Sequence, residues 1–182
     1  RFYRSVLPET IRLTPPHVWR WNNWLSESEA LDRAISEADR VLAKHANRLA
    51  ALVLEPVMQG AVGMWPQPLG YVKALRELTS RHDILLICDE VATGFGRTGT
   101  MFACEQEEVS PDILCLAKGL TGGYLPLAAT LTTDHIYQEF LGRPDEGRTL
   151  FYGHTYTGNP LGCAVANASL DLFETDEVIQ GL

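Results

Sequence analysis

The sequence lacks any concentration of positive charge. Its 15 Lys and Arg residues are outnumbered by 23 Asp and Glu residues, which gives a formal net charge of −8 at pH 7 and an isoelectric point near 5.1. Proteins that bind the phosphate backbone of nucleic acids carry a basic patch or stripe. The charge balance therefore argues against a nucleic-acid partner and is common among soluble enzymes.

Long apolar runs are also missing. No stretch approaches the roughly 18 apolar residues that a membrane-spanning helix needs. The N-terminal segment RFYRSVLPETIRL has no uninterrupted apolar core of the kind found in signal peptides. These absences predict a protein without a membrane segment, located in the cytoplasm.

Cysteine is scarce, and its positions form no pattern typical of a metal site or a disulfide framework. Cys88, Cys104, Cys115 and Cys163 include no C-x-x-C pair. Cys88 and Cys115 lie inside apolar runs, where a free thiol behaves as a small hydrophobic side chain. We therefore expect free cysteines and no metal centre.

What the sequence does contain is an alternation of short apolar runs with amphipathic segments. The apolar runs, predicted as strands, cover residues 49–54, 84–88, 112–117 and 127–132. The amphipathic segments, predicted as helices, cover residues 27–47, 68–81 and 160–174. The alternation predicts an α/β fold: a mostly parallel sheet with helices on both faces. Since the run 49–54 is apolar throughout, we expect it to be covered on both sides.

Local signals mark the starts of two of these helices. Ser26 is followed three positions later by Glu29, which is the capping-box pattern. Asn159 and Pro160 place a capping side chain and a proline in the first turn of the last helix. Both helix starts are therefore predicted from a few neighbouring residues.

A glycine pattern follows the second predicted strand. The stretch ICDEVATGFGRTG holds a G-x-G-x-x-G at Gly94, Gly96 and Gly99. A dinucleotide-binding loop places its glycines at the strand end and continues into a helix. Here Asp89 and Glu90 occupy the strand end, where they would repel a pyrophosphate, and too few residues follow the glycines for a crossover helix. A nucleotide-binding oxidoreductase is therefore kept only as a distant alternative.

A carboxylate at the end of a buried strand is better suited to a cation. The simpler interpretation of Asp89 is that it caps the following turn. However, Lys118 stands at the end of the next predicted strand, and lysines are rarely buried without a functional reason. Since neighbouring parallel strands end at one edge, where ligands bind, we expect Asp89 and Lys118 to converge on one pocket.

Four segments give the sequence a specific resemblance. They are LEPVMQGAVGM, ICDEVATGFGRTG, PDILCLAKGLTGGYLPLAAT and GHTYTGNPLGCAVANASL. In this order and spacing they resemble the class III aminotransferases, which use pyridoxal 5′-phosphate. The resemblance is dense over residues 49–175 and loose before them. It implies a fold-type I transferase, of which residues 1–182 would form an incomplete large domain without the family's flanking segments. We expect such a chain alone to turn over little or no substrate.

The resemblance assigns roles to residues at the strand ends. Asp89 matches the aspartate that pairs with the pyridine nitrogen of the cofactor, and a carboxylate there keeps this nitrogen protonated. Lys118 matches the lysine that bonds the cofactor aldehyde and later carries a proton, for which it must be deprotonated in an apolar pocket. Val91, two residues after Asp89, would lie on the same side of an extended segment and pack on the ring.

Two further matches concern the phosphate and the substrate. Thr155 matches the threonine that reaches the cofactor phosphate of the neighbouring subunit, which implies a homodimer with shared active sites. Without the resemblance, Thr155 would be an ordinary loop hydroxyl. Arg97 aligns with an arginine near the substrate, and its planar guanidinium suits a carboxylate. A loop arginine that donates to backbone carbonyls is the alternative.

These observations predict a pyridoxal-phosphate-dependent aminotransferase that acts on small molecules. Within the class, the segments most resemble enzymes that transfer an amino group from S-adenosylmethionine to 7-keto-8-aminopelargonate in biotin biosynthesis. Another ω-amino acid or diamine aminotransferase is the alternative, because pocket contacts that distinguish donors contribute only a few kcal/mol each. A non-catalytic interaction domain on a transaminase scaffold is a third possibility.

Overall fold

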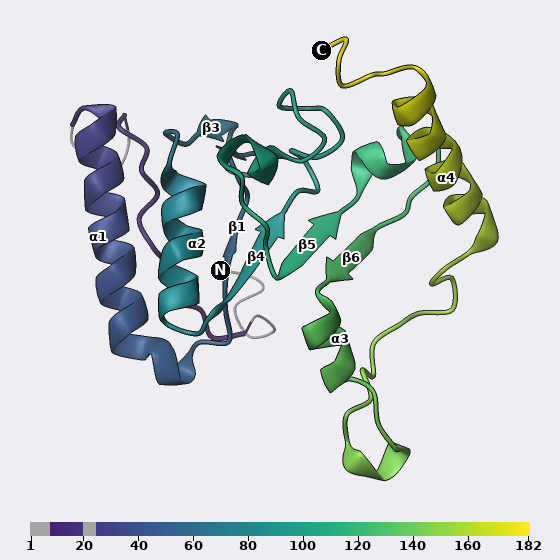
Figure 1. The fold of residues 1–182 in the computed structure, drawn as a ribbon, viewed down its shortest axis with the longest axis horizontal. Helices are drawn as coiled ribbons and strands as arrows, with labels where there is room; N and C mark the ends of the chain where they lie inside the picture. The colour runs from purple at the N-terminus through teal and green to yellow at the C-terminus, as the bar shows by residue number, and fades with distance from the viewer. Residues whose placement is uncertain (1–7, 20–24) are drawn as a thin grey trace.

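The structure, a computed structural model, describes residues 8–19 and 25–182 and is built around a four-stranded sheet (Figure 1). The strands follow the order β1 (Ala51–Leu54), β4 (Leu85–Asp89), β5 (Ile113–Leu116) and β6 (Ala129–Thr132). β1, β4 and β5 run parallel, and β6 is antiparallel to β5. A separate antiparallel ribbon joins β2 (Met58–Gln59) to β3 (Trp65–Pro66). This mixed, mostly parallel sheet with its helices confirms the α/β prediction.

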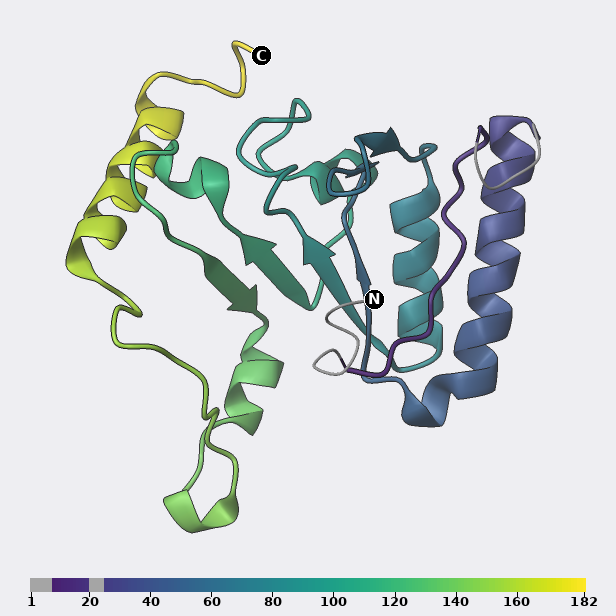
Figure 2. The same cartoon turned by 180° about the vertical axis from the view of Figure 1, so that it is seen from behind.

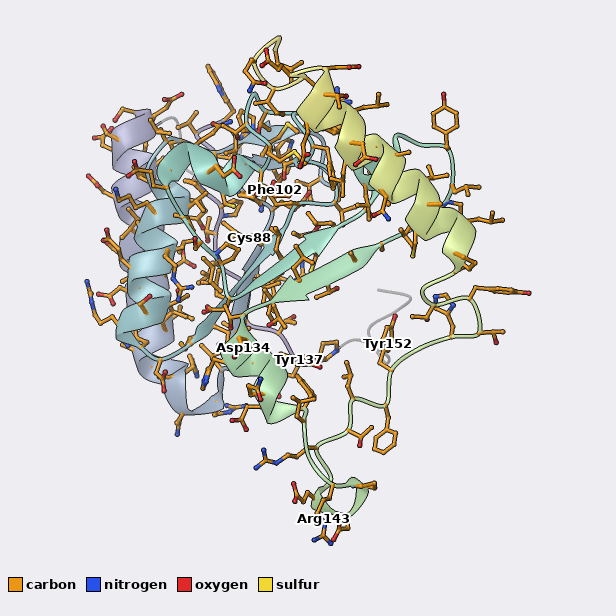
Figure 3. The ribbon with its side chains drawn as sticks, turned by 45° about the vertical axis from the view of Figure 1, so that its right-hand side comes forward. Cys88, Phe102, Asp134, Tyr137, Arg143 and Tyr152 are labelled. Carbon is orange, nitrogen blue, oxygen red and sulfur yellow. The ribbon has the colours of Figure 1, made fainter. Side chains whose placement is uncertain are left out.

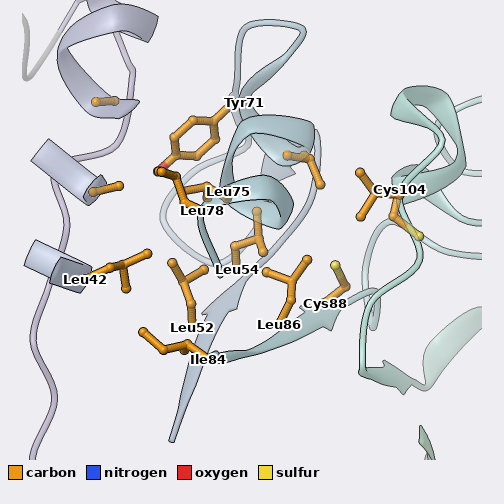
Figure 4. Close-up of a cluster of buried hydrophobic side chains, with 14 residues drawn as sticks. Leu42, Leu52, Leu54, Tyr71, Leu75, Leu78, Ile84, Leu86, Cys88 and Cys104 are labelled. Atoms are coloured by element: carbon orange, nitrogen blue, oxygen red, sulfur yellow. The ribbon is translucent and has the colours of Figure 1, made fainter. Parts of the chain in front are cut away.

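The hydrophobic core lies between the sheet and two helices. α2 (Tyr71–Arg81) packs against β4, and α1 (Glu27–His45) packs against α2, as Figures 1 and 2 show from opposite sides. Figure 4 shows the buried cluster that these elements share, which includes Leu42, Leu52, Leu54, Leu75, Leu78, Leu86 and Cys88. Burial of such side chains contributes about 1.5–3 kcal/mol each, so this layer supplies much of the stability.

The prediction that the first strand is covered on both sides is wrong for this chain. Leu52 and Leu54 are buried on the helix side, but Val53 is 63% exposed on the opposite side. Side chains alternate along a strand, and α1 and α2 both lie on the side of Leu52. α4 (Pro160–Thr175) lies beyond β6, far from β1 (Figures 1 and 2).

The two predicted helix starts are confirmed. The Ser26 hydroxyl accepts a hydrogen bond from the Glu29 amide at 3.3 Å, and the Glu29 carboxylate accepts one from the Ser26 amide at 2.9 Å. At α4, the side-chain oxygen of Asn159 accepts a hydrogen bond from the amide of Gly162 at 2.7 Å. These bonds satisfy backbone donors that the first helical turn leaves without partners.

The second helix starts three residues later than predicted, at Tyr71. Gly70 has a φ of +94°, a left-handed conformation that separates the preceding Pro68 from the helix. No side chain at Gly70 caps the helix. Instead the Glu107 carboxylate, from the 3-10 helix η2 (Ala103–Glu107), accepts a hydrogen bond from the Lys73 amide at 2.8 Å.

Residues 133–158, which we call the arm, extend away from the sheet between β6 and α4. The arm contains α3 (Asp134–Glu139) and the 3-10 helix η4 (Pro144–Glu146). Figure 3 shows Tyr137, Arg143 and Tyr152 along it, apart from the core around Cys88. The other 3-10 helices are η1 (Ala46–Arg48) and η3 (Lys118–Thr121), and α4 packs against η3.

Candidate active site

Asp89 and Lys118 leave the sheet at the same edge. Asp89 is the last residue of β4 and pairs in register with Cys115 of β5. The Glu90 amide continues this ladder by donating to the Cys115 carbonyl at 2.9 Å. Lys118 follows shortly after Cys115 and opens η3. Because β4 and β5 are parallel neighbours, both residues stand at the carboxyl edge, where ligands bind in sheets of this kind.

The carboxylate of Asp89 is half-buried and partly committed to the backbone. Its Oδ1 accepts a hydrogen bond from the Val91 amide at 3.1 Å, so Asp89 does cap the following turn. Among the described residues, its Oδ2 accepts no hydrogen bond. Burial, followed by the negative charge of Asp89, raises the pKa of the Cys115 thiol. Asp89 therefore lies close to Cys115 and retains one oxygen for a cationic partner.

The geometric reason given for Val91 is wrong. The chain turns after Glu90, and residues 91–98 form successive turns instead of an extended segment. The bond between Asp89 and the Val91 amide closes the first of these turns. Spacing by two residues therefore does not place Val91 on the same side as Asp89.

Lys118 differs from its prediction in one respect, because it is exposed and not enclosed. Its backbone φ is +46°, a left-handed conformation that costs a non-glycine residue about 1–3 kcal/mol and is found most often at functional sites. Lys118 lines a cavity of about 1380 Å³. The glycine turn that follows, Gly122 and Gly123, is itself exposed, so this side of the cavity leaves Lys118 open to solvent.

The cavity walls come from residues 117–130 and 152–161. Tyr124, Tyr152 and Tyr156 line it, and these three residues were missed from the sequence. Their positions in the sequence could have indicated them. Tyr124 directly follows the glycines after Lys118, and Tyr152 and Tyr156 lie on either side of Thr155. The lining is mainly apolar, as in most small-molecule sites.

Thr155 lies on the arm, exposed, at the start of the turn over residues 155–158. It does not line the cavity, whereas its neighbours His154 and Thr157 do. The His154 amide donates to the Thr157 hydroxyl at 3.0 Å, and the Tyr156 amide donates to Nδ1 of His154 at 3.2 Å. His154 therefore stabilises the turn that presents Thr155.

Arg97 is exposed at the tip of the glycine loop. Gly96 and Gly99 have φ angles of +78° and +97°, which glycine adopts readily and other residues do not. Neither Arg97 nor Asp89 nor Val91 lines the cavity around Lys118. The expected convergence of Asp89 and Lys118 on one pocket is therefore not seen in this cavity, which Lys118 lines and Asp89 does not.

The glycine loop does not lead into an α-helix. It continues into η2, a 3-10 helix of five residues. A dinucleotide site requires the N-terminus of a full helix aimed at the pyrophosphate. The nucleotide-binding interpretation therefore lacks the element that would hold the ligand.

Comparison with known proteins decides the family. The model of the family "Aminotransferase class-III" matches residues 2–182. The chain belongs to the class-III aminotransferases. One member, adenosylmethionine-8-amino-7-oxononanoate aminotransferase of Nitratidesulfovibrio vulgaris, is 51% identical over 180 residues, which are 99% of this chain and 33% of that protein.

Solved aminotransferase structures share the fold. Adenosylmethionine-8-amino-7-oxononanoate aminotransferase from Methanocaldococcus jannaschii superposes with a TM-score of 0.78 at 51% identity, over 81% of this chain and 35% of that one. An amine transaminase from an uncultivated Pseudomonas species, solved in its PLP-bound form, gives a TM-score of 0.84 at 40% identity, over 92% and 38%. The chain thus spans between a third and two fifths of the length of these relatives.

Proposed function

We propose that this protein is a pyridoxal-phosphate-dependent aminotransferase of biotin biosynthesis. It transfers an amino group from S-adenosylmethionine to 7-keto-8-aminopelargonate and forms 7,8-diaminopelargonate. The observation that carries the proposal is the 51% identity, across 99% of the chain, to an aminotransferase named for these two compounds. Another class III ω-amino acid or diamine aminotransferase is the alternative, favoured by the high TM-score to an amine transaminase.

The residues at the sheet edge fit pyridoxal phosphate. The Oδ2 of Asp89 accepts no hydrogen bond within the described residues and suits a protonated ring nitrogen, while Lys118 supplies an amine beside a cavity of about 1380 Å³. When bound, the cofactor supplies an electron sink that stabilises negative charge on the substrate carbon. One of the superposing transaminases was solved with this cofactor, which supports the same assignment here.

Each proposed residue has a physical task at this site. Asp89 keeps the ring nitrogen charged, because a nearby carboxylate favours the protonated form. Lys118 would hold the cofactor through Nζ. Once the substrate amine has displaced it, the neutral Nζ would move the proton from the substrate carbon that bears the amino group to the cofactor carbon. Val91 packs on the ring, and Arg97 binds the substrate carboxylate with its planar guanidinium.

The protein acts as a homodimer in which Thr155 binds the cofactor phosphate of the partner subunit. The arm that carries Thr155 supports this proposal, because Leu150, Phe151 and Tyr152 are 61%, 90% and 86% exposed in succession. Contiguous apolar surface of this kind marks an interaction site. None of the helices in residues 8–19 and 25–182 combines the length and apolar character that spanning a membrane requires. We place the dimer in the cytoplasm.

The absorbance spectrum after addition of pyridoxal phosphate tests the proposal. We expect a band near the visible edge that disappears on borohydride treatment and is absent in Lys118→Ala. The control Lys44→Ala, at an exposed lysine of α1, should keep the band. Protection by NAD without a band would support an oxidoreductase, and dimerisation without a band would support a non-catalytic domain. Comparing S-adenosylmethionine with diamines as donors separates the two aminotransferase alternatives.

A further inference from the structure

Glu90 is a fully buried carboxylate, with an exposed fraction of 0%. One oxygen, Oε2, accepts hydrogen bonds from the Ala103 amide at 2.7 Å and the Thr93 hydroxyl at 3.0 Å. The other oxygen, Oε1, accepts a bond from the Cys104 amide at 2.8 Å. All three donors are neutral, and hydrogen bonds to a carboxylate are about twice as strong as those between neutral groups. Both oxygens are therefore committed, and Glu90 has none left for a ligand.

These bonds close the glycine loop over residues 91–102. The side chain of Glu90 ties the beginning of the loop to η2 at its end, while the Glu90 amide is bonded to the Cys115 carbonyl of β5 at 2.9 Å. Glu90 is thus held through its backbone to the sheet and through its side chain to η2. The peptide bond immediately before it belongs to Asp89, so the same contacts restrict where Asp89 can lie.

The closed loop also reaches the turn that carries Lys118. Phe95 lies against Gly119, since a Cβ built on that glycine would be only 2.7 Å from the Phe95 Cβ. Phe95 is held by a hydrogen bond from its amide to the Met101 carbonyl at 2.7 Å. Its ring packs edge-on against Phe102, with centroids 5.8 Å apart. The loop therefore forms the support on which η3 begins.

Both sides of this contact are strained. Phe95 has a φ of +59°, and Lys118, next to Gly119, has a φ of +46°. Non-glycine residues keep such left-handed conformations only where the surrounding structure holds them. The Met101 carbonyl and the Phe102 ring, both in the loop that Glu90 closes, hold Phe95 on one side, and the ring of Phe173 on α4 lies against it with centroids 6.2 Å apart.

We propose that Glu90 is a positioning residue: its buried carboxylate closes the glycine loop, and the closed loop, through Phe95 and Gly119, fixes the backbone of Lys118 beside Asp89. The proposal rests on the function proposed above in assigning Lys118 and Asp89 to the cofactor. Glu90 itself contacts neither cofactor nor substrate.

The test compares Glu90→Gln with the matched variant Glu107→Gln. Glu107 is also a buried carboxylate, 7% exposed, that accepts a backbone hydrogen bond, but its partner is Lys73 of α2. Glutamine keeps the size of the side chain and turns one acceptor into a donor that faces another donor. Both variants bury an amide in place of a carboxylate. An effect seen in Glu90→Gln but not in Glu107→Gln is therefore due to the loop that leads to Lys118.

Hydrogen exchange measured on the protein without cofactor is the first readout. In Glu90→Gln we expect exchange about tenfold faster both in residues 93–104 and in residues 118–122. In Glu107→Gln the faster exchange should be confined to the first turn of α2. Faster exchange in 93–104 with unchanged exchange in 118–122 would show that Glu90 stabilises only its own loop and would overturn the proposal.

The second readout is the pH midpoint of the cofactor absorbance band, which reports the amine of Lys118. We expect Glu90→Gln to shift this midpoint and Glu107→Gln to leave it unchanged. An unshifted midpoint in Glu90→Gln would contradict the proposal. If the wild-type protein shows no band, the proposed function fails, while hydrogen exchange still decides whether Glu90 controls the Lys118 turn.

Phe95→Leu keeps the proposal testable if Glu90→Gln does not fold. This substitution leaves the three hydrogen bonds of Glu90 in place and shortens the side chain that lies on Gly119. We expect residues 93–104 to stay protected and exchange in residues 118–122 to accelerate. Unchanged exchange in both segments would overturn the link between the loop and Lys118.

Discussion

Asp112, the residue before β5, forms a largely buried ion pair with Arg76 of α2. Its Oδ2 accepts a hydrogen bond from Nη1 of Arg76 on α2 at 2.7 Å and another from the Leu86 amide of β4 at 2.7 Å. Both side chains of the ion pair are largely buried, with 21% and 26% of their surface exposed. One carboxylate oxygen therefore ties α2 to β4 and β5, the two strands whose far ends carry Asp89 and Lys118.

Asp112→Ala should destabilise the protein by about 1–3 kcal/mol, because it leaves the Leu86 amide and Arg76 without their acceptor. The matched control is Asp145→Ala, which removes an exposed ion pair with Arg143 at 2.8 Å. Exposed pairs contribute about 0–1 kcal/mol. Urea unfolding of both variants measures the difference. Equal losses in the two variants would show that the bonds of Asp112 do not stabilise this corner of the sheet.

Glu107→Gln should lower stability by about 1 kcal/mol, which is the usual size of a lost helix cap. The reason is that α2 has no side-chain cap of its own, and the Lys73 amide depends on Glu107 from a distant segment. Thermal unfolding followed by circular dichroism measures the change. A wild-type midpoint would mean that water replaces the carboxylate without loss.

The raised pKa of Tyr71 predicts a loss of stability at alkaline pH. Burial, and secondly the charge of Glu37, raises the pKa of Tyr71 to about 12. Since an unfolded tyrosine ionises near pH 10, the unfolded chain releases this proton first as the pH rises. The stabilising contribution is complete below pH 10 and disappears as the pH approaches 12, a change of about 2–3 kcal/mol.

Tyr71→Phe should remove this alkaline sensitivity, because phenylalanine has no proton to release. Tyr124→Phe is the control, at a tyrosine that is 85% exposed. Unfolding free energies measured between pH 8 and 11 give the comparison. If the unfolding free energies of both variants follow the wild-type curve, ionisation of Tyr71 does not cause the loss of stability at alkaline pH.

Phe151→Ser should weaken the proposed homodimer. Phe151 is 90% exposed in the chain alone, and burial of a phenylalanine between subunits contributes about 1.5–3 kcal/mol. We therefore expect the dissociation constant to rise about 10- to 100-fold in analytical ultracentrifugation. Leu69→Ser, at a residue 74% exposed beside α2, should leave the dimer unchanged. Equal effects of the two substitutions would remove the arm from the interface.

Features that depend on neighbouring residues were predicted well. The capping box of Ser26 and Glu29 and the cap at Asn159 use bonds that span three residues, so the sequence contains both partners. The strands at 51–54 and 85–89 were found because an uninterrupted apolar run of that length has few alternatives in an α/β chain.

The site was predicted only in part, because some of its features depend on contacts between segments that are distant in the sequence. Asp89 and Lys118 could be placed at one sheet edge because parallel strands share their carboxyl ends. The extended segment expected at Val91 is a turn, because a side chain closes it, which strand periodicity does not describe. Lys118 was expected to be enclosed, but exposure depends on which segments pass over a residue and not on its neighbours in the chain.

The sequence by itself determined the fold class, the family and the positions of the charged residues at the ends of β4 and β5. Only the tertiary structure decided that Glu90 closes the glycine loop, that Phe95 lies on Gly119, that Glu107 caps α2, and that three tyrosines line the cavity around Lys118. Local hydrogen bonds and apolar periodicity are encoded within a few residues, whereas these contacts join segments that meet only after the chain has folded.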